Sequence, residues 1–132
     1  MENVIQSGSR DFNAVFAHND EMAIGVIQAM KNAGLVPGVD AIVVGIDGAR
    51  DAVKAIIAGE QSMSVFLDAK VLAERTLDIV DAIEGGGAPA TVTTFDNNVI
   101  DVPTVLYDPV VVTEDNWRIV IDRGLYTEAD FQ

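Results

Sequence analysis

The chain has 132 residues, of which 49% are hydrophobic, and this fits one globular domain with a sizeable core rather than a disordered segment. Its 21 acidic residues against 8 basic ones give a formal net charge of −13. This charge argues against nucleic acid and anionic membranes as partners, because their phosphates would be repelled. No cysteine is present, which excludes disulfides and thiolate metal sites.

Neither a membrane span nor a signal peptide is evident in the sequence. No apolar run approaches the roughly 20 residues that a membrane-spanning helix needs. The first residues, Met1 to Ile5, lack the basic start and the apolar core of a signal peptide. If Met1 is a natural start, we expect the chain as written to remain in the cytoplasm.

The first two thirds of the chain alternate apolar segments with helical patterns. The predicted strands and helices follow one another over residues 14–18, 20–33, 41–46, 49–58, 62–67 and 69–84. Strands joined by helical crossovers run parallel, so the three carboxyl ends lie along one edge of one sheet. The sequence therefore predicts an α/β fold built on a parallel sheet.

The pattern changes after the flexible segment 85–89. Short β-rich segments cover residues 91–95, 99–106 and 110–113, and Asp96-Asn97-Asn98 is a turn signal between the first two. A last helix over 114–123, capped by Thr113, and a final turn over 127–131 complete the prediction.

Three polar residues follow the predicted strands and are candidate ligand contacts. In open α/β sheets, ligands bind outside the carboxyl ends of the strands, which singles out Asn19, Asp47 and Asp68. A carboxylate accepts several hydroxyl hydrogen bonds, and an asparagine amide both donates and accepts. Asn19 with Asp47 would suit the adjacent hydroxyls of a sugar, and such binding needs no cofactor.

Two other interpretations of the same carboxylates stay open. Asp20, Asp47 and Asp68 could simply cap the helices that follow them. Alternatively, these three aspartates could coordinate Mg²⁺ in a phosphoryl-transfer enzyme. The enzyme hypothesis is weak, because no predicted strand ends in a lysine or arginine that would neutralise phosphate.

The aromatic residues and the single histidine give less specific signals. His18 has no second metal ligand and no nucleophile near it in the sequence, so we interpret it as a hydrogen-bonded residue at a strand end. Phe16 and Phe66 fall inside predicted strands and are expected in the core, although an aromatic ring near a sheet edge can also stack on a sugar.

Two motifs and the tail together carry a family resemblance. Residues 16–25, FAHNDEMAIG, and 43–48, VVGIDG, resemble the periplasmic sugar-binding proteins of ABC importers with the ribose-binding type of fold. The tail, residues 94–103 and 109–117, looks like the branch that binds xylose and multiple monosaccharides. The resemblance implies a Rossmann-like, three-layer type I periplasmic-binding-protein fold and a protein that is not an enzyme.

The same resemblance implies roles for particular residues and partners. Asn19 and Asp47 would hydrogen-bond a pentose or hexose, while a third family ligand falls at the position of Leu67, which cannot make that bond. The complete parent would be periplasmic or at the cell surface and would deliver its sugar to an ABC permease. The alternative family is the effector domain of LacI-type repressors, although no helix-turn-helix precedes the motifs here.

Family members are considerably longer and have two lobes, so this chain resembles only their C-terminal portion and the fold is expected to be incomplete. By resemblance, residues 1–67 and 108–132 belong to the second lobe, and 68–107 cross the hinge into the first. We expect the exposed stripe of the helix over 69–84 to make the isolated chain self-associate, as a homo-oligomer or an element-swapped dimer. Alone, it should bind sugar weakly or not at all.

Overall fold

The computed structural model describes residues 1–8, 11–91 and 93–132. Parts of the predicted connection 9–13 and of the predicted strand 91–95 therefore lie outside the described residues. The chain forms two compact units, Met1–Leu67 with Val110–Gln132, and Asp68–Pro109. The assignment of these units to two lobes stays a prediction.

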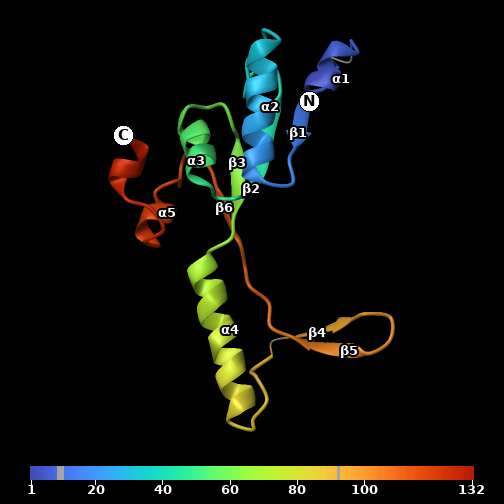
Figure 1. Cartoon of the computed structure of the whole chain (residues 1–132), viewed down its shortest axis with the longest axis vertical. Coiled ribbons are helices and arrows are strands. Elements are labelled where there is room, and N and C mark those ends of the chain that lie inside the picture. The colour runs from blue at the N-terminus through green and yellow to red at the C-terminus, as the bar shows by residue number, and fades with distance from the viewer. Residues whose placement is uncertain (9–10, 92) are drawn as a thin grey trace. The chain divides into compact units, whose positions relative to one another are not determined.

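The first unit is built on a four-stranded sheet in the order β1-β2-β3-β6 (Figure 1). Its strands are β1 Ala14–Phe16, β2 Ile42–Asp47, β3 Met63–Phe66 and β6 Val110–Val112. β1 pairs with β2, and β2 with β3, in parallel, as the crossover argument predicts. β6 pairs antiparallel with β3.

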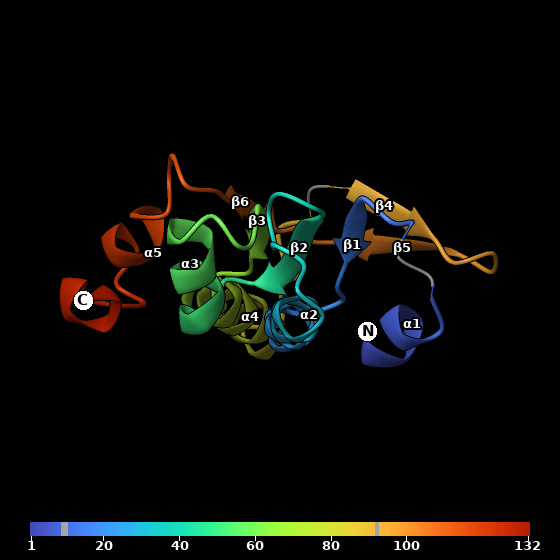
Figure 2. The ribbon, with the colours of Figure 1, turned by 90° about the horizontal axis from the view of Figure 1, so that it is seen from above.

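The helices of this unit are α1 Glu2–Gln6, α2 Asp20–Asn32, α3 Arg50–Ile57, α5 Ile119–Asp122 and the 3₁₀ helix η1 Glu128–Phe131. Seen from above, α2 and α3 lie on the same side of the sheet (Figure 2). α2 ends just before Gly34, which takes the left-handed conformation, φ 76°, that favours glycine after a helix.

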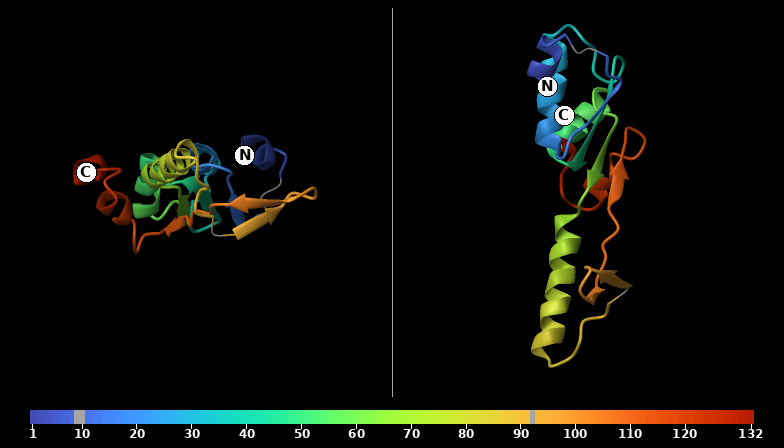
Figure 3. Two further views of the ribbon diagram at one scale, coloured as in Figure 1. Left: turned by 90° about the horizontal axis from the view of Figure 1, so that it is seen from below. Right: turned by 90° about the vertical axis from the view of Figure 1, so that its right-hand side faces the viewer.

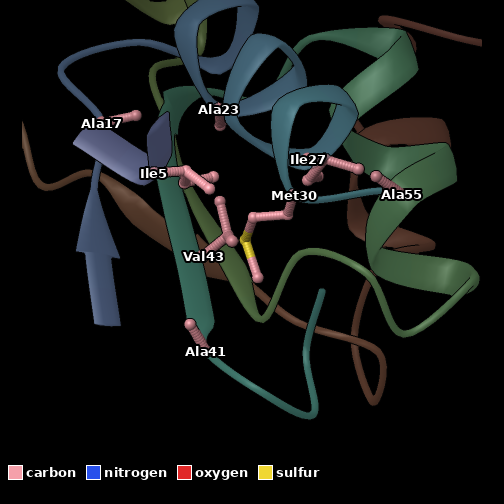
Figure 4. Packing of buried hydrophobic residues seen from close by; sticks show 8 residues of the cluster. All are labelled: Ile5, Ala17, Ala23, Ile27, Met30, Ala41, Val43 and Ala55. Carbon is pink, nitrogen blue, oxygen red and sulfur yellow. The ribbon is translucent and has the colours of Figure 1, made fainter. Parts of the chain in front are cut away.

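Two apolar clusters form the core between the sheet and these helices. The first gathers side chains of α1, α2, α3 and of the strands β1 and β2 with their flanking residues (Figure 4): Ile5, Ala17, Ala23, Ile27, Met30, Ala41, Val43 and Ala55. The second consists of Val53, Ile56, Phe66, Val112 and Val120. The prediction of Phe66 as a core residue is confirmed.

The other face of the same sheet carries apolar side chains that are only partly covered. Side chains alternate between the faces of a strand, so the residues next to buried Ala17, Val43 and Val112 point the opposite way. Among these, Phe16, Ile42 and Val111 are 63%, 51% and 48% exposed. The prediction that Phe16 belongs to the core is therefore wrong.

The second unit contains α4 Ala69–Glu84 and an antiparallel hairpin of β4 Thr93–Asp96 and β5 Asp101–Thr104 (Figure 3). α4 has the predicted bounds, and none of its residues is buried. Its apolar stripe, which includes Leu72, Val80 and Ile83, is exposed as expected. Among the described residues of this unit, Asp68 is the one that is buried.

The predicted helix over 114–123 is largely wrong, because only Ile119–Asp122 is helical. Residue Asn116 explains the difference: its Oδ1 accepts from the Thr113 backbone N–H at 2.7 Å, and its Nδ2 donates to the Val111 carbonyl at 2.8 Å. These side-chain bonds favour turns over a regular helix. In the described part of the chain, no helix combines the length and apolarity that a bilayer crossing requires.

Candidate functional site

Asn19 and Asp47 lie at the same edge of the sheet in the first unit. β1 and β2 are parallel, with Phe16 opposite Val44, so their carboxyl ends point the same way. Asn19 follows the end of β1 and Asp47 is the last residue of β2. This edge is where an open α/β sheet binds ligands.

Asn19 is fixed as the N-cap of α2. Its backbone is extended, with φ −154° and ψ 171°, and its side-chain Oδ1 accepts from the Met22 backbone N–H at 2.9 Å. This hydrogen bond fixes the orientation of the side-chain amide. The Nδ2 group of Asn19 is therefore the part of the amide that can donate to a ligand.

Asp47 is exposed and has an unusual backbone. Its φ of 115° lies in the left-handed half of conformational space, and Gly48 follows with φ 74°. A non-glycine residue in such a conformation costs of order 1–3 kcal/mol and persists only where its surroundings enforce it. Glycine is required at position 48, because a Cβ there would come within 2.6 Å of the Phe66 ring.

The electrostatic surroundings of Asp47 disfavour its charged form. Its pKa is raised from the usual value, first by the loss of hydration and then by the negative charges of Asp20 and Glu21. The alternative that Asp47 caps α3 is wrong. Ala49 is the N-cap residue of that helix, and no side-chain hydrogen bond caps the helix there.

A buried carboxylate network beneath this edge enforces the turn. Asp20 is fully buried, and its Oδ1 accepts from Gln61 Nε2 at 3.0 Å while its Oδ2 accepts from the Ala49 backbone N–H at 2.8 Å. The Ser64 hydroxyl lies 2.9 and 2.8 Å from these two oxygens. Ser64 Oγ in turn accepts from the Gly48 backbone N–H at 3.0 Å.

This network ties the start of α2 to β3 and to the two residues that follow Asp47. The alternative that Asp20 caps its own helix is therefore wrong, because its carboxylate supports the start of α3 instead. Gly45 is part of the arrangement, since a Cβ there would lie 2.2 Å from Asp20 Oδ1. The network thus fixes the backbone on both sides of the candidate site.

Asp68 has a structural role in the second unit. It is 3% exposed and is the N-cap of α4, where its Oδ1 accepts from the backbone N–H groups of Lys70 at 3.1 Å and Val71 at 3.2 Å. Its own N–H donates to the Tyr107 hydroxyl at 3.1 Å. The predicted role of Asp68 as a ligand contact stays a prediction.

The remaining candidates near the edge are aromatic rings and a small pocket. His18 is exposed, and its ring is edge-on to Phe16 with centroids 6.2 Å apart. A pocket of about 410 Å³ lies where α2 and α3 begin, lined by residues that include Asp20, Arg50 and Tyr126. Asn19 and Asp47 do not line this pocket.

Metal binding finds no support in this arrangement. Among the described residues, no group of three or more histidine or acidic side chains could hold a metal ion. The oxygens of Asp20, which the Mg²⁺ hypothesis needs, already accept hydrogen bonds from three protein groups.

Sequence reasoning missed the partners of Asp20. Ser64 carries a weak signal, because it is a polar residue at an inward-facing position of an apolar strand. Gln61 carries none: it lies 41 residues from Asp20 in the chain, and only the fold brings the two together.

Comparison with known proteins gives a consistent set of relatives. Residues 1–88 match the family described as periplasmic binding protein domain. The multiple sugar-binding periplasmic protein SbpA of Azospirillum brasilense is 38% identical, over 100% of this chain and 39% of SbpA. The D-xylose-binding periplasmic protein of Escherichia coli is 34% identical, over 98% of this chain and 39% of that protein.

Solved structures show that the similarity includes the fold. An ABC transporter solute-binding protein from Clostridium phytofermentans with bound β-D-glucose superposes with a TM-score of 0.85 at 35% identity, covering 99% of this chain and 42% of that one. A carbohydrate transporter solute-binding protein from Chloroflexus aurantiacus, in complex with D-glucose, gives 0.84 at 30% identity, covering 99% and 39%. The chain spans about two fifths of the length of the relatives it matches.

Proposed function

Because the chain belongs to the periplasmic binding protein domain family, we propose that it supplies part of a monosaccharide site in the solute-binding component of a carbohydrate ABC importer. The observation that carries this proposal is the common edge of Asn19 and Asp47, held from below by the Asp20 network. The names of the relatives support the chemistry, since they bind D-xylose, D-glucose or several sugars.

The two residues divide the work of holding a sugar. The Asp47 carboxylate accepts hydrogen bonds from adjacent hydroxyls of a pentose or hexose, and charged acceptors make these bonds strong. The Asn19 amide nitrogen donates to a hydroxyl oxygen, while its oxygen stays on the cap of α2. The ligand therefore meets groups that are already oriented, which lowers the entropy lost on binding.

Other features predict weak binding by this chain on its own. Leu67, at the position where the family resemblance implies a polar ligand, is partly exposed and has no hydrogen-bonding side chain. Asp68 is used as the cap of α4. In the parent, residues 1–67 and 108–132 would form one wall of the cleft, and the segment 68–107 would lead into the opposite lobe.

The proposed role is binding and delivery rather than catalysis. The named relatives are solute-binding proteins, so the parent would act in the periplasm and pass its sugar to an ABC permease. The Mg²⁺ enzyme is not favoured, because the Asp20 oxygens are occupied. The repressor effector domain is not favoured either, because the relatives are transport proteins.

A titration followed by NMR tests the proposal on the chain itself. Adding D-xylose, D-glucose or D-galactose should shift the backbone signals of Asn19, Asp47 and Gly48, and Asp47→Ala should abolish these shifts. Glu60→Ala, which removes an acidic side chain outside the candidate edge, is the matched control and should leave them unchanged. Shifts that persist in Asp47→Ala would contradict the proposal, because the sugar would then bind away from this edge.

A further inference from the structure

The peptide bond between Asp47 and Gly48 has a chemistry that the proposed function does not use. It is the one aspartyl-glycyl bond among the 132 residues of the sequence, which has no asparaginyl-glycyl bond. In such a pair the side-chain carboxyl carbon and the next backbone nitrogen can close a five-membered imide ring, and glycine hinders this closure least because it has no side chain. Asp47 is exposed to water, whereas Gly48 is buried against the hydrogen-bonded network beneath the turn.

A line of hydrogen bonds leads from the Gly48 nitrogen to a buried carboxylate. The Gly48 N–H donates to Ser64 Oγ at 3.0 Å, and this hydroxyl lies 2.9 and 2.8 Å from the two oxygens of Asp20. A serine hydroxyl accepts one hydrogen bond while it donates another, so the three groups are joined in one direction. The distances lie within the reach of a general base that acts through one intervening group. The amide proton of Gly48 therefore has a route to the Asp20 carboxylate.

Two further properties of Asp47 favour closure of the ring. Its φ of 115° stores backbone strain, and an isoaspartyl linkage, which adds a CH₂ group to the main chain, relieves that constraint. Its pKa is raised, first by the loss of hydration and then by the charges of Asp20 and Glu21. A larger fraction of this side chain is therefore protonated at a given pH, and the protonated carboxyl is the form that can lose its hydroxyl group as water.

We propose that Asp47-Gly48 is a site of spontaneous isoaspartate formation, and that the fold promotes the reaction through Ser64 and Asp20. The Gly48 nitrogen attacks Cγ of the protonated Asp47 side chain and forms the N–Cγ bond. Its proton passes to Ser64 Oγ while the Ser64 hydroxyl proton passes to Asp20. The Cγ–OH bond breaks, and the hydroxyl group leaves as water with a proton from solvent. Asp20 returns its proton to solvent, so the net change is the loss of one water.

Water then opens the imide ring and restores the atoms lost on closure. Attack at the former main-chain carbonyl leaves residue 47 joined to Gly48 through its side-chain carbon, as isoaspartate, and attack at Cγ restores the original chain. The new carboxylate lies directly on Cα and is one carbon shorter than the Asp47 side chain. Its effect on sugar contact rests on the proposed function, whereas the isomerisation does not.

The test follows the full chain during incubation without sugar. Trypsin cleaves after Lys31 and Arg50, and the peptide 32–50 that it releases contains both Asp40 and Asp47. Chromatography and fragmentation by mass spectrometry measure isoaspartate at each position. We expect it to accumulate at residue 47 at least about tenfold faster in the folded chain than in a synthetic peptide of residues 32–50. Asp40, which Ala41 follows, is the internal control and should stay at background.

A pair of serine variants tests the route of the proton. Ser64→Ala removes the hydroxyl group between Gly48 and Asp20 without adding an atom, and it should slow isoaspartate formation in the folded chain roughly tenfold. Ser62→Ala makes the same change at an exposed residue two positions earlier and should leave the rate unchanged. Circular dichroism checks that Ser64→Ala folds. If it does not fold, the comparison of the unchanged chain with the peptide decides, because that comparison needs no variant.

Two outcomes would overturn the inference. A folded chain that isomerises at residue 47 no faster than the peptide would show that the network holds the turn against the reaction. A folded Ser64→Ala chain that isomerises as fast as the unchanged chain would exclude the route through Ser64 and Asp20. Both measurements are made without sugar, so a chain that binds no sugar would contradict the proposed function and leave this result intact.

Discussion

The two faces of one sheet differ in how completely they are built. The helix-covered face encloses both apolar clusters and the Asp20 network, in which both carboxylate oxygens of Asp20 accept hydrogen bonds from the first unit. The opposite face of the sheet, which we call the open face, presents the apolar side chains of Phe16, Ile42 and Val111 to solvent. The hydrogen bonds that support the edge of Asn19 and Asp47 all lie on the helix-covered face. The geometry of this candidate site therefore does not require the opposite face of the sheet to be covered.

The largest expected effect comes from neutralising the buried carboxylate on the covered face. Asp20→Asn replaces one of the two acceptor oxygens with an amide donor, which then faces either the Ala49 N–H or the Gln61 Nε2 group, and it should lower the free energy of unfolding by roughly 3 kcal/mol. Urea denaturation measures this loss. Glu21→Gln, the same change on the exposed neighbour, should cost under about 1 kcal/mol, and equal losses would show that the network is not the cause.

A pair of glycines gives the next largest contrast. Gly45→Ala brings a methyl group within 2.2 Å of Asp20 Oδ1 and should destabilise by about 1–3 kcal/mol. Gly25→Ala, inside α2 with open space around it, should instead stabilise by about 0.5–1 kcal/mol. Thermal unfolding of the two variants measures both signs, and a stabilised Gly45→Ala would contradict the packing described here.

Two variants of Asn19, the N-cap of α2, distinguish its contribution to stability from its contribution to sugar binding. Asn19→Ala removes the bond to Met22 and should cost about 1 kcal/mol of unfolding free energy. Asn19→Asp keeps a capping oxygen but loses the amide donor, so it should unfold like the unchanged chain and bind sugar more weakly. If Asn19→Asp binds sugar as before, the amide nitrogen has no role in recognition.

Substitutions on the open face should reduce the free energy of unfolding less than substitutions on the helix-covered face. Ile42→Thr with Val111→Thr alters side chains that are already about half in water and should change the unfolding free energy of the isolated chain by about 0.5 kcal/mol or less for each residue. Denaturation of the double variant checks this. A loss comparable to that of Asp20→Asn would mean that the open face is part of the core.

The smallest effect concerns the pH dependence of stability. The raised pKa of Asp47 means that the folded chain holds this proton more tightly than the unfolded one, so stability falls as the pH rises above the ordinary aspartate range. Asp47→Asn removes this titration and should flatten the pH profile, with slightly higher stability at neutral pH. Asparagine also tolerates a positive φ. An unchanged profile would contradict the raised pKa of Asp47, which comes first from the loss of hydration and then from the charges of Asp20 and Glu21.

Local patterns predicted the elements, and long-range contacts account for what was missed. The bounds of α4 follow from its own periodicity and from the Asp68 cap, which lie in one continuous stretch. The role of Asp20 could not be predicted from local patterns, because its partners Ala49, Gln61 and Ser64 are 29, 41 and 44 residues away in the chain.

Two wrong predictions have separate causes. The prediction for Phe16 assumed a strand covered on both faces, and the chain leaves one face open. The prediction of a helix over 114–123 failed because the Asn116 side chain bonds the Thr113 N–H and the Val111 carbonyl, which favours a turn over a regular helix.

The span of the Asp20 network has a consequence for how the chain folds. During synthesis, Asn19 and Asp47 both leave the ribosome before Ser64, the residue that bridges Asp20 to the Gly48 turn. Contacts over such sequence separations form late, because the intervening loop must close first. A nascent chain that already contains both candidate sugar ligands therefore gains their geometry only when β3 is added to the sheet.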